Sequence, residues 1–359
     1  MKRTVQVALL AAMAFTAGCG TEFYANKMMN VDTSRGRFDL ALAGSPDKLI
    51  ETGKITSYQQ PRIGNQQLEL WLISASSGIT ARTGGVSLGT VLLVHDIHRS
   101  KASMLSLGGK LAEMGFDVVL PDLRAHGASQ GEAFTYGAYE KRDLKVIMDA
   151  LLRQGSIDDK IVAYGEGLGA SVAVGYAAID PNCAGVVAYQ PYADIASVLR
   201  QDGTFKFLSE PDLADVVALG ADMGKFDPLQ ASATEAAAGL TCPLLVIRRR
   251  ADFGYPLEQA HAVYDRTGGA KEFFEIPMSD DWAYKTAAAS YLADVINAFT
   301  NGGLVTGHYR AITSDQAAPP ATPPVPQPFQ PRESDGPPVP SGGDGAIPTP
   351  TVIHRTRLR

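Results

Sequence analysis

Residues 160–180 read KIVAYGEGLGASVAVGYAAID, and they indicate the fold class more clearly than other parts of the chain. The run KIVAY is apolar and predicts a buried strand, and ASVAVGYAAID predicts a helix. Between them stand Gly165, Gly167 and Gly169, which allow the chain to turn sharply from strand to helix. A strand that leads directly into a helix is typical of a parallel sheet covered by helices.

The same alternation of strands and helices continues on both sides of this stretch. Further buried strands are expected in TVLLVHDI, DVVLPDL, AGVVAYQP, PLLVIRR and KEFFEIP. Two shorter strands, near residues 55–63 and 68–73, are expected to form an antiparallel edge. Together they give an α/β domain with eight strands and helices on both faces. Residues 192–240 interrupt the repeat and are expected to be a partly helical cap insertion or a long crossover.

Two motifs carry a family resemblance. His95 and Asp96 follow one strand, and DLRAHGAS at residues 122–129 follows the next. With these motifs in this order, residues 51–303 resemble the α/β-hydrolase superfamily, in its branch of monoacylglycerol-lipase-like esterases and serine aminopeptidases. In that branch the corresponding motifs are His-Gly and Asp-Leu-Arg-Gly-His-Gly-x-Ser. The resemblance implies an α/β-hydrolase fold with a mostly parallel eight-stranded sheet and a small cap.

The catalytic triad of that family has only partial counterparts here. The family places its nucleophilic serine at the centre of a G-x-S-x-G turn. Here the turn reads GEGLG, so Gly167 stands at the serine position. The resemblance puts Asp281 at the histidine position and Asp252 at the acid position. We therefore assign no catalytic residue and expect a degenerate triad.

Other side chains offer alternative chemistry. Ser171 is expected to pack inside the helix, and Ser129 to serve in a turn. A rearranged acid/base pair or a metal site with Asp96 stays open because three histidines follow the strands nearby: His95, His98 and His126.

A cation site of hard oxygen ligands also stays open, formed by Glu166, Asp252 and Asp281. None of these patterns is a specific cofactor or metal motif, so no cofactor and no metal are expected. The resemblance implies that the backbone N–H groups of Ile97 and Leu168 form an oxyanion hole. Because Glu166 and Asp281 add negative charge, the former active-site pocket is expected to favour a small neutral or cationic ligand.

Three functions follow as hypotheses. The leading one is a binding or scaffolding pseudo-hydrolase. The second is an esterase, lipase or peptidase with displaced catalytic residues. The third is a structural spacer that acts through the proline-rich tail.

The first residues resemble a bacterial lipoprotein signal. Lys2 and Arg3 precede the apolar run VQVALLAAMAFTA, which is too short to span a bilayer, and TAGC ends at Cys19. We expect residues 1–18 to be a signal peptide, Cys19 to be acylated, and residues 19–50 to be a tether. The protein would then be anchored to a membrane of the cell envelope. The alternative is an ordinary signal peptide and a soluble secreted protein.

The C-terminal residues 304–359 are expected to be a disordered tail, because 12 of the 22 prolines lie in residues 319–350. This tail is a candidate ligand for an envelope protein. The formal net charge of −6 argues against nucleic acid as a partner. Cys183 and Cys242 precede or begin neighbouring strands, so they are expected either to form a disulfide or to remain buried thiols.

Overall fold

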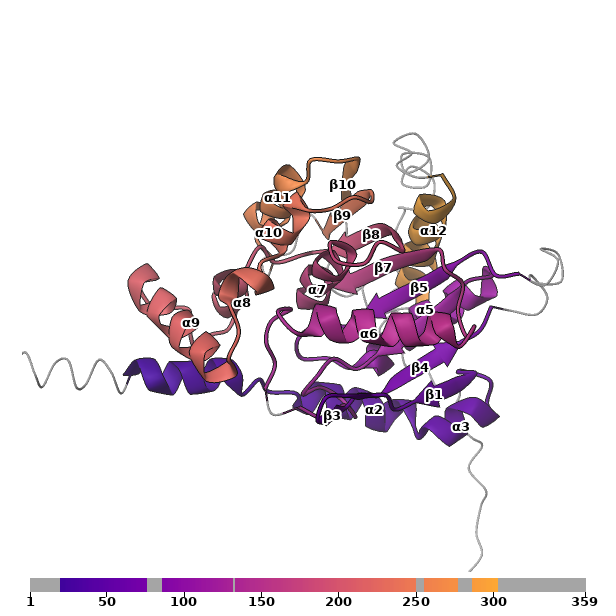
Figure 1. Ribbon diagram of the computed structural model, residues 1–359, viewed down its shortest axis with the longest axis horizontal. Helices are drawn as coiled ribbons and strands as arrows, with labels where there is room; N and C mark the ends of the chain where they lie inside the picture. Colours follow the sequence, from indigo (N-terminus) through magenta and orange to yellow (C-terminus); the bar gives the residue numbers. More distant parts are fainter. Residues whose placement is uncertain (1–19, 76–85, 132, 250–254, 277–285, 303–359) are drawn as a thin grey trace, which may run out of the picture. The chain divides into compact units, whose positions relative to one another are not determined.

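The computed structural model describes residues 20–75, 86–131, 133–249, 255–276 and 286–302 (Figure 1). All of these residues belong to the first of two compact units, which spans residues 1–315. The centre is an eight-stranded sheet with the strand order β1-β4-β6-β5-β7-β8-β9-β10. Neighbouring strands from β6 to β10 pair in parallel, and β4 is antiparallel to both β1 and β6. The strands of this sheet are β1 (Ser57–Gln59), β4 (Leu70–Ile73), β5 (Thr90–Val94), β6 (Asp117–Pro121), β7 (Ile161–Glu166), β8 (Cys183–Tyr189), β9 (Leu244–Arg249) and β10 (Lys271–Ile276).

Helices cover both faces of the sheet, as the alternating pattern predicted. The α-helices are α2 (Ser34–Ala43), α3 (Pro46–Glu51), α5 (Leu105–Glu113), α6 (Glu140–Arg153), α7 (Leu168–Ala177), α8 (Ile195–Leu199), α9 (Glu210–Gly224), α10 (Ala233–Ala238), α11 (Leu257–Arg266) and α12 (Thr286–Gly302). Residues 20–29 are also helical, and there are two 3₁₀ helices, η1 (Lys101–Met104) and η2 (Pro228–Ala231). Figure 1 shows α6 and α7 in front of the sheet.

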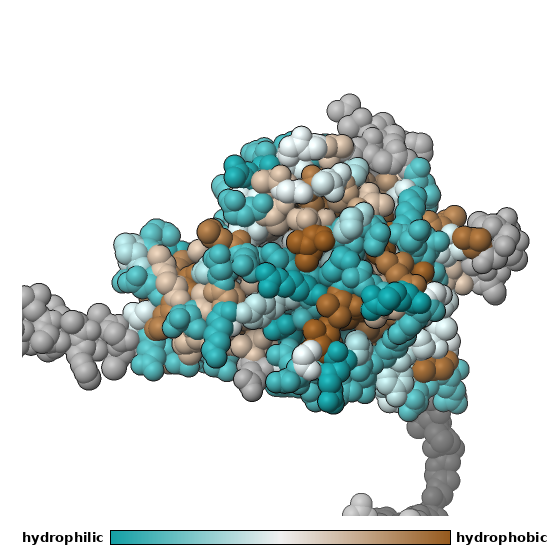
Figure 2. Space-filling view, viewed as in Figure 1, coloured by the Kyte–Doolittle hydropathy of each residue, from teal (hydrophilic) through white to brown (hydrophobic). Residues whose placement is uncertain are grey.

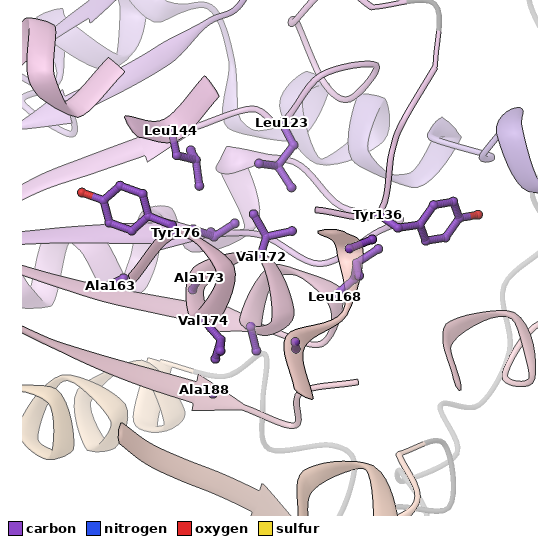
Figure 3. Packing of buried hydrophobic residues seen from close by; sticks show 14 of the residues in the cluster. Leu123, Tyr136, Leu144, Ala163, Leu168, Val172, Ala173, Val174, Tyr176 and Ala188 are labelled. Atoms are coloured by element: carbon purple, nitrogen blue, oxygen red, sulfur yellow. The ribbon is translucent and has the colours of Figure 1, made fainter. Parts of the chain in front are cut away.

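The sheet has a separate hydrophobic core on each face, because side chains alternate along every strand. In β7, Ile161 and Ala163 belong to the core that contains residues of α6 and α7. Val162 and Tyr164 belong to the core that contains residues of α5 and α12. Helix α7 is buried along its whole length, and its small apolar residues pack closely against β7 and β8 (Figure 3). On the face shown in Figure 2, apolar residues are scattered among hydrophilic ones, which is normal for a folded domain.

The opening strands are shorter than expected. The predicted strand 55–63 is divided into β1 and β2 (Arg62–Ile63), with Pro61 just before β2. Proline has no N–H to donate to a sheet, which accounts for the break. Strand β2 pairs with β3 (Gln66–Gln67) in a separate two-stranded sheet.

The insertion between β8 and β9 contains α8, α9, η2 and α10. Within it the expected helix begins at Glu210, after Ser209, whose side chain accepts a hydrogen bond from the N–H of Asp212. Ser209 therefore caps the helix and sets its start.

Residues 20–50, which lie within the expected tether, contain helices. Residues 20–29 are helical, and α2 and α3 follow. Met28 is fully buried, and a Cβ on Gly220 of α9 would lie 2.7 Å from its Sδ atom. The hydroxyl of Tyr136 also donates to the carbonyl oxygen of Met28 at 2.8 Å. Each of these short helices buries only a few side chains, so the sequence shows little periodicity there.

Several predicted features lie outside the described residues. They are the signal peptide, Cys19, Asp252, Asp281 and the tail from residue 304. In the described part of the chain, no helix is both long enough and apolar enough to cross a membrane.

Candidate functional site

The turn between β7 and α7 has the geometry of a nucleophile elbow. Gly167 has φ 56° and ψ −120°, a conformation that costs a non-glycine residue about 1–3 kcal/mol. The neighbouring glycines are needed for close packing, because a Cβ on Gly165 would lie 2.2 Å from the carbonyl oxygen of Gly169. A Cβ on Gly169 would in turn lie 2.3 Å from the carbonyl oxygen of His95. The sharp strand-to-helix turn is therefore present, with no side chain at its apex.

The carboxylate of Asp96 lies where two backbone N–H groups converge. Its Oδ1 atom accepts hydrogen bonds from the N–H of Ile97 and from the N–H of Leu168, each at 2.8 Å. These are the two donors that the family resemblance assigns to the oxyanion hole. Oδ2 accepts a third hydrogen bond, from the hydroxyl of Tyr255 at 2.8 Å. Asp96 thus places an internal negative charge at the position expected for a substrate oxyanion.

Asp96 and Gly167 depend on each other sterically. A Cβ on Gly167 would lie 2.3 Å from Oδ1 of Asp96 and 2.5 Å from its Cγ. Both separations are far below van der Waals contact, so a serine at position 167 and this conformer of Asp96 exclude each other.

The hydroxyl of Tyr255 donates its hydrogen bond to Oδ2 of Asp96. The ring of Tyr255 lies 5.2 Å from that of Tyr192, measured between centroids. Burial, with the negative charge of Asp96 adding to it, raises the pKa of Tyr255 well above its usual value. The phenol therefore stays protonated and serves Asp96 as a donor.

Glu166, the residue before the elbow apex, is a partly buried carboxyl group near Asp96. Its Oε1 accepts a hydrogen bond from the hydroxyl of Tyr164 at 2.9 Å. Burial raises the pKa of Glu166 to about 7, and the charge of Asp96 contributes in the same direction. Glu166 therefore changes its charge near neutral pH.

The three candidate histidines act as structural residues. His95 is fully buried, its Nδ1 donates to the carbonyl oxygen of Asp96 at 2.8 Å, and its Nε2 accepts from the N–H of Leu123 at 3.1 Å. Burial, and His126 after it, lowers the pKa of His95 well below its usual value, so His95 is neutral. His126 lies between the carbonyl oxygens of Arg124 and Ile97, and His98 contacts the carbonyl oxygen of Asp32 at 2.8 Å.

The described residues contain no group of three or more histidine, cysteine, aspartate or glutamate side chains arranged to hold a metal ion. The proposed site of Glu166 with Asp252 and Asp281 lies partly outside the described residues.

Both alternative serines are engaged with backbone groups. The hydroxyl of Ser171 donates to the carbonyl oxygen of Tyr192 at 2.8 Å and accepts from its N–H at 3.0 Å. The hydroxyl of Ser129 donates to the carbonyl oxygen of Asp122 at 2.8 Å and accepts from the N–H of Glu69 at 2.9 Å. Each serine holds two chain segments together, as expected for packing and turn residues.

A buried charged network fixes the loop that carries the DLRAHGAS motif. The carboxylate of Asp122 accepts from the ammonium group of Lys101 and, at 2.8 Å, from the N–H of Ala128. Lys101 is fully buried and also pairs with Glu69 at 2.9 Å. Gly127 is required here, because its φ is 54° and a Cβ would lie 2.1 Å from Oδ2 of Asp122.

The two cysteines are buried free thiols at neighbouring strands. Cys183 begins β8, and Cys242 lies two residues before the start of β9. The thiol of Cys242, together with burial, raises the pKa of Cys183 well above its usual value.

Sequence reasoning missed the main contact of the site. It indicated Asp96 only as a ligand for a metal, and it gave no role to Tyr255. One signal was available, since Asp96 stands where the family resemblance expects glycine. The sequence could not show that the added carboxylate turns back onto the N–H of the following residue.

Comparison with known proteins supports the same fold. The family model of serine aminopeptidases, S33, matches residues 86–210. The Bacillus subtilis (strain 168) protein YqkD, described as uncharacterised, is 24% identical over 191 residues, which are 52% of this chain and 62% of that protein. The alignment thus spans less than two thirds of that relative.

Solved structures with this fold include an esterase from Pyrococcus furiosus, with a TM-score of 0.56, 19% identity, and coverage of 76% of this chain and 98% of the esterase. An alpha-beta hydrolase from Vibrio vulnificus has a TM-score of 0.53 and 16% identity, with coverage of 79% of this chain and 92% of that one. The expected fold class is confirmed. The chain has the fold of the α/β-hydrolase superfamily, and its residues 86–210 are similar to the serine aminopeptidases of family S33.

Proposed function

We propose that this chain is a ligand-binding protein built on an α/β-hydrolase domain, and that it does not act as a serine hydrolase. The single observation that supports this proposal is the position of Asp96. Acyl transfer needs two N–H donors at 2.7–3.1 Å from the developing oxyanion. The N–H groups of Ile97 and Leu168 instead bond Oδ1 of Asp96 at 2.8 Å.

A substrate carbonyl would have to displace this carboxylate. Asp96 would lose two backbone hydrogen bonds and the one from Tyr255, and hydrogen bonds to charged groups contribute about 1.5–3 kcal/mol each. Such a penalty would oppose binding of an ester or amide in the reactive position. Gly167 supplies no nucleophile, and the hydroxyls of Ser129 and Ser171 are both bonded to the backbone.

The competing proposal is a hydrolase with displaced catalytic residues. The match to serine aminopeptidases and the similarity to an esterase favour it. It requires Asp96 to leave the two N–H groups and another residue to serve as nucleophile. The third hypothesis, a spacer that acts through the tail, concerns residues outside the described part of the chain.

Ester hydrolysis tests the proposal. Purified protein is assayed with p-nitrophenyl butyrate, beside a working esterase of this fold as positive control. We expect turnover no greater than that of Asp96→Asn, a variant that keeps the size of the side chain. Enzyme-like turnover by the wild type would overturn the proposal.

We also propose that the domain is anchored to an envelope membrane through a lipid on Cys19. Residues 20–29, which follow Cys19 in the sequence, form a helix whose Met28 contacts α9. The wild-type protein should incorporate labelled palmitate and leave membranes only when detergent is added. Cys19→Ala should abolish both properties. An unlabelled wild type would overturn the anchoring proposal and leave the proposed binding function untouched.

A further inference from the structure

A groove of about 870 Å³ runs along α5 on the side of the sheet opposite to α7. Apolar side chains from four elements line it: Leu42 of α2, Ile73 of β4, Leu105 and Leu107 of α5, and Leu292 of α12. Helix α5 has nine residues and is therefore about 13 Å long. The α5 residues that line the groove run from Leu105 to Glu113, so the groove follows the helix over this length.

Most charged groups along the groove are already paired. Arg99 bonds Asp39 at 2.8 Å, and Lys110 bonds Glu113 at 2.8 Å. Lys54 and Glu166 also line the groove, and neither has an ion pair within the described residues. Oε1 of Glu166 accepts from Tyr164, and within the described residues its Oε2 has no hydrogen-bond partner.

The charged groups around Glu166 do not fully compensate the negative charge of its ionised carboxylate. Asp96 adds negative charge and is already bonded to two N–H groups, whereas Arg99 is paired with Asp39. Burial is the largest influence on the pKa of Glu166 and raises it to about 7, although Tyr164, Arg99 and Arg249 act in the opposite direction. A cationic group beside Oε2 would compensate the lost hydration of this carboxylate and favour its ionised form.

We propose that this groove binds an amphiphile with an apolar chain along α5 and an ammonium head group on Glu166. The inference rests on the proposed binding function, and it names both the site and the class of ligand. The oxyanion-hole groups take no part in this site.

A variant that fills the groove provides the sharpest test. Gly109 lines the groove, lies within α5, and has no atom within 4 Å of the position of an added Cβ. Gly109→Leu should therefore occupy the groove without disturbing the packing of α5. Gly109→Ala is the matched control, and thermal unfolding checks that both variants are folded.

The probes are decylamine, decanol and decanoate, which share a chain and differ in the head group. Binding is measured by isothermal titration calorimetry below the concentrations at which the probes aggregate. We expect decylamine to bind most tightly to the wild type and to Gly109→Ala, and at least ~10-fold more weakly to Gly109→Leu. Tighter binding of decanoate, or equal binding to both Gly109 variants, would overturn the inference.

The pH dependence separates an ion pair from simple partition of the chain. If decylamine binds the ionised form of Glu166, its affinity should rise about 10-fold from pH 6 to pH 8, since the ionised fraction rises by that factor around a pKa of about 7. Glu166→Gln should remove this dependence, and Glu113→Gln, a variant of another carboxylate in the groove, should keep it.

An unchanged pH dependence in Glu166→Gln would overturn the assignment of the head-group site. If the groove does not bind decylamine as predicted, the proposed binding function is not affected, but its ligand must bind at another site. Enzyme-like ester turnover would overturn the proposed function whatever the outcome of the binding experiment.

Discussion

The carboxylate of Asp96 occupies the space that any side chain at position 167 would need, since a Cβ on Gly167 would lie 2.3 Å from Oδ1. Asp96 and Gly167 should therefore be energetically coupled. We expect Gly167→Ala to destabilise the wild type by several kcal/mol, from the clash and from about 1–3 kcal/mol of backbone strain. In an Asp96→Gly background only the strain remains.

A double-mutant cycle by chemical denaturation measures this coupling. We expect a coupling free energy of about 1–3 kcal/mol, which is typical of residues in contact. Gly109→Ala is the control, because its added Cβ meets open space and should stabilise the helix slightly. An equal cost of Gly167→Ala in both backgrounds would show that the two residues do not compete for this space.

Glu166 makes stability depend on pH. Its pKa is raised from 4.5 to about 7 in the folded state, so its contribution to stability is fully present below pH 4.5 and is lost as the pH rises through 7. Because glutamine does not ionise, Glu166→Gln removes this loss of stability at high pH. The variant should therefore exceed the wild type in free energy of unfolding by only a small amount at pH 5 and by about 2–3 kcal/mol at pH 8.

Urea denaturation at both pH values checks this expectation. Glu113→Gln serves as the control, because the side chain of Glu113 is 66% exposed. A constant difference between Glu166→Gln and the wild type across this range would contradict the account of Glu166.

Cys183 and Cys242 should form a disulfide when the domain is oxidised. The two thiols are buried side chains at neighbouring strands and influence each other's pKa. Closing this loop would stabilise the domain by up to about 4 kcal/mol in the chain-entropy model. After incubation with oxidised glutathione, followed by alkylation in denaturant without reductant, we expect a protein with neither of these thiols alkylated. If both thiols are alkylated, the disulfide prediction is wrong and the two cysteines serve only as packing residues.

Rebuilding the active site should require three changes. Gly167→Ser supplies a nucleophile, Asp281→His supplies a base at the position that the family resemblance indicates, and Asp96→Gly clears the two N–H groups. A working triad contributes about 10⁶-fold in turnover, as in the serine protease subtilisin. We expect measurable ester hydrolysis only in the triple variant. Equal activity with Asp96 left in place would contradict the blocking role of this carboxylate.

The sequence predicted the fold well because the fold depends on local patterns. The run KIVAY, the glycines of the elbow and the DLRAHGAS motif each determine a short segment, and their order determines the sheet. The candidate site was predicted less well. The contact between Asp96 and Leu168 joins residues 72 positions apart and depends on the direction of one side chain. The helices of residues 20–51 were missed because tertiary contacts such as that of Met28 with Gly220 stabilise them, and local periodicity does not.

Intact-mass analysis after treatment with a fluorophosphonate tests whether the protein carries an activated serine. This probe forms an adduct with a serine that has an activating base and free oxyanion donors. Because Gly167 has no hydroxyl and Asp96 holds the N–H groups of Ile97 and Leu168, we predict that the wild-type protein keeps its unmodified mass. An adduct on any serine, with Ser171 and Ser129 as the first to map by peptide sequencing, would contradict the account.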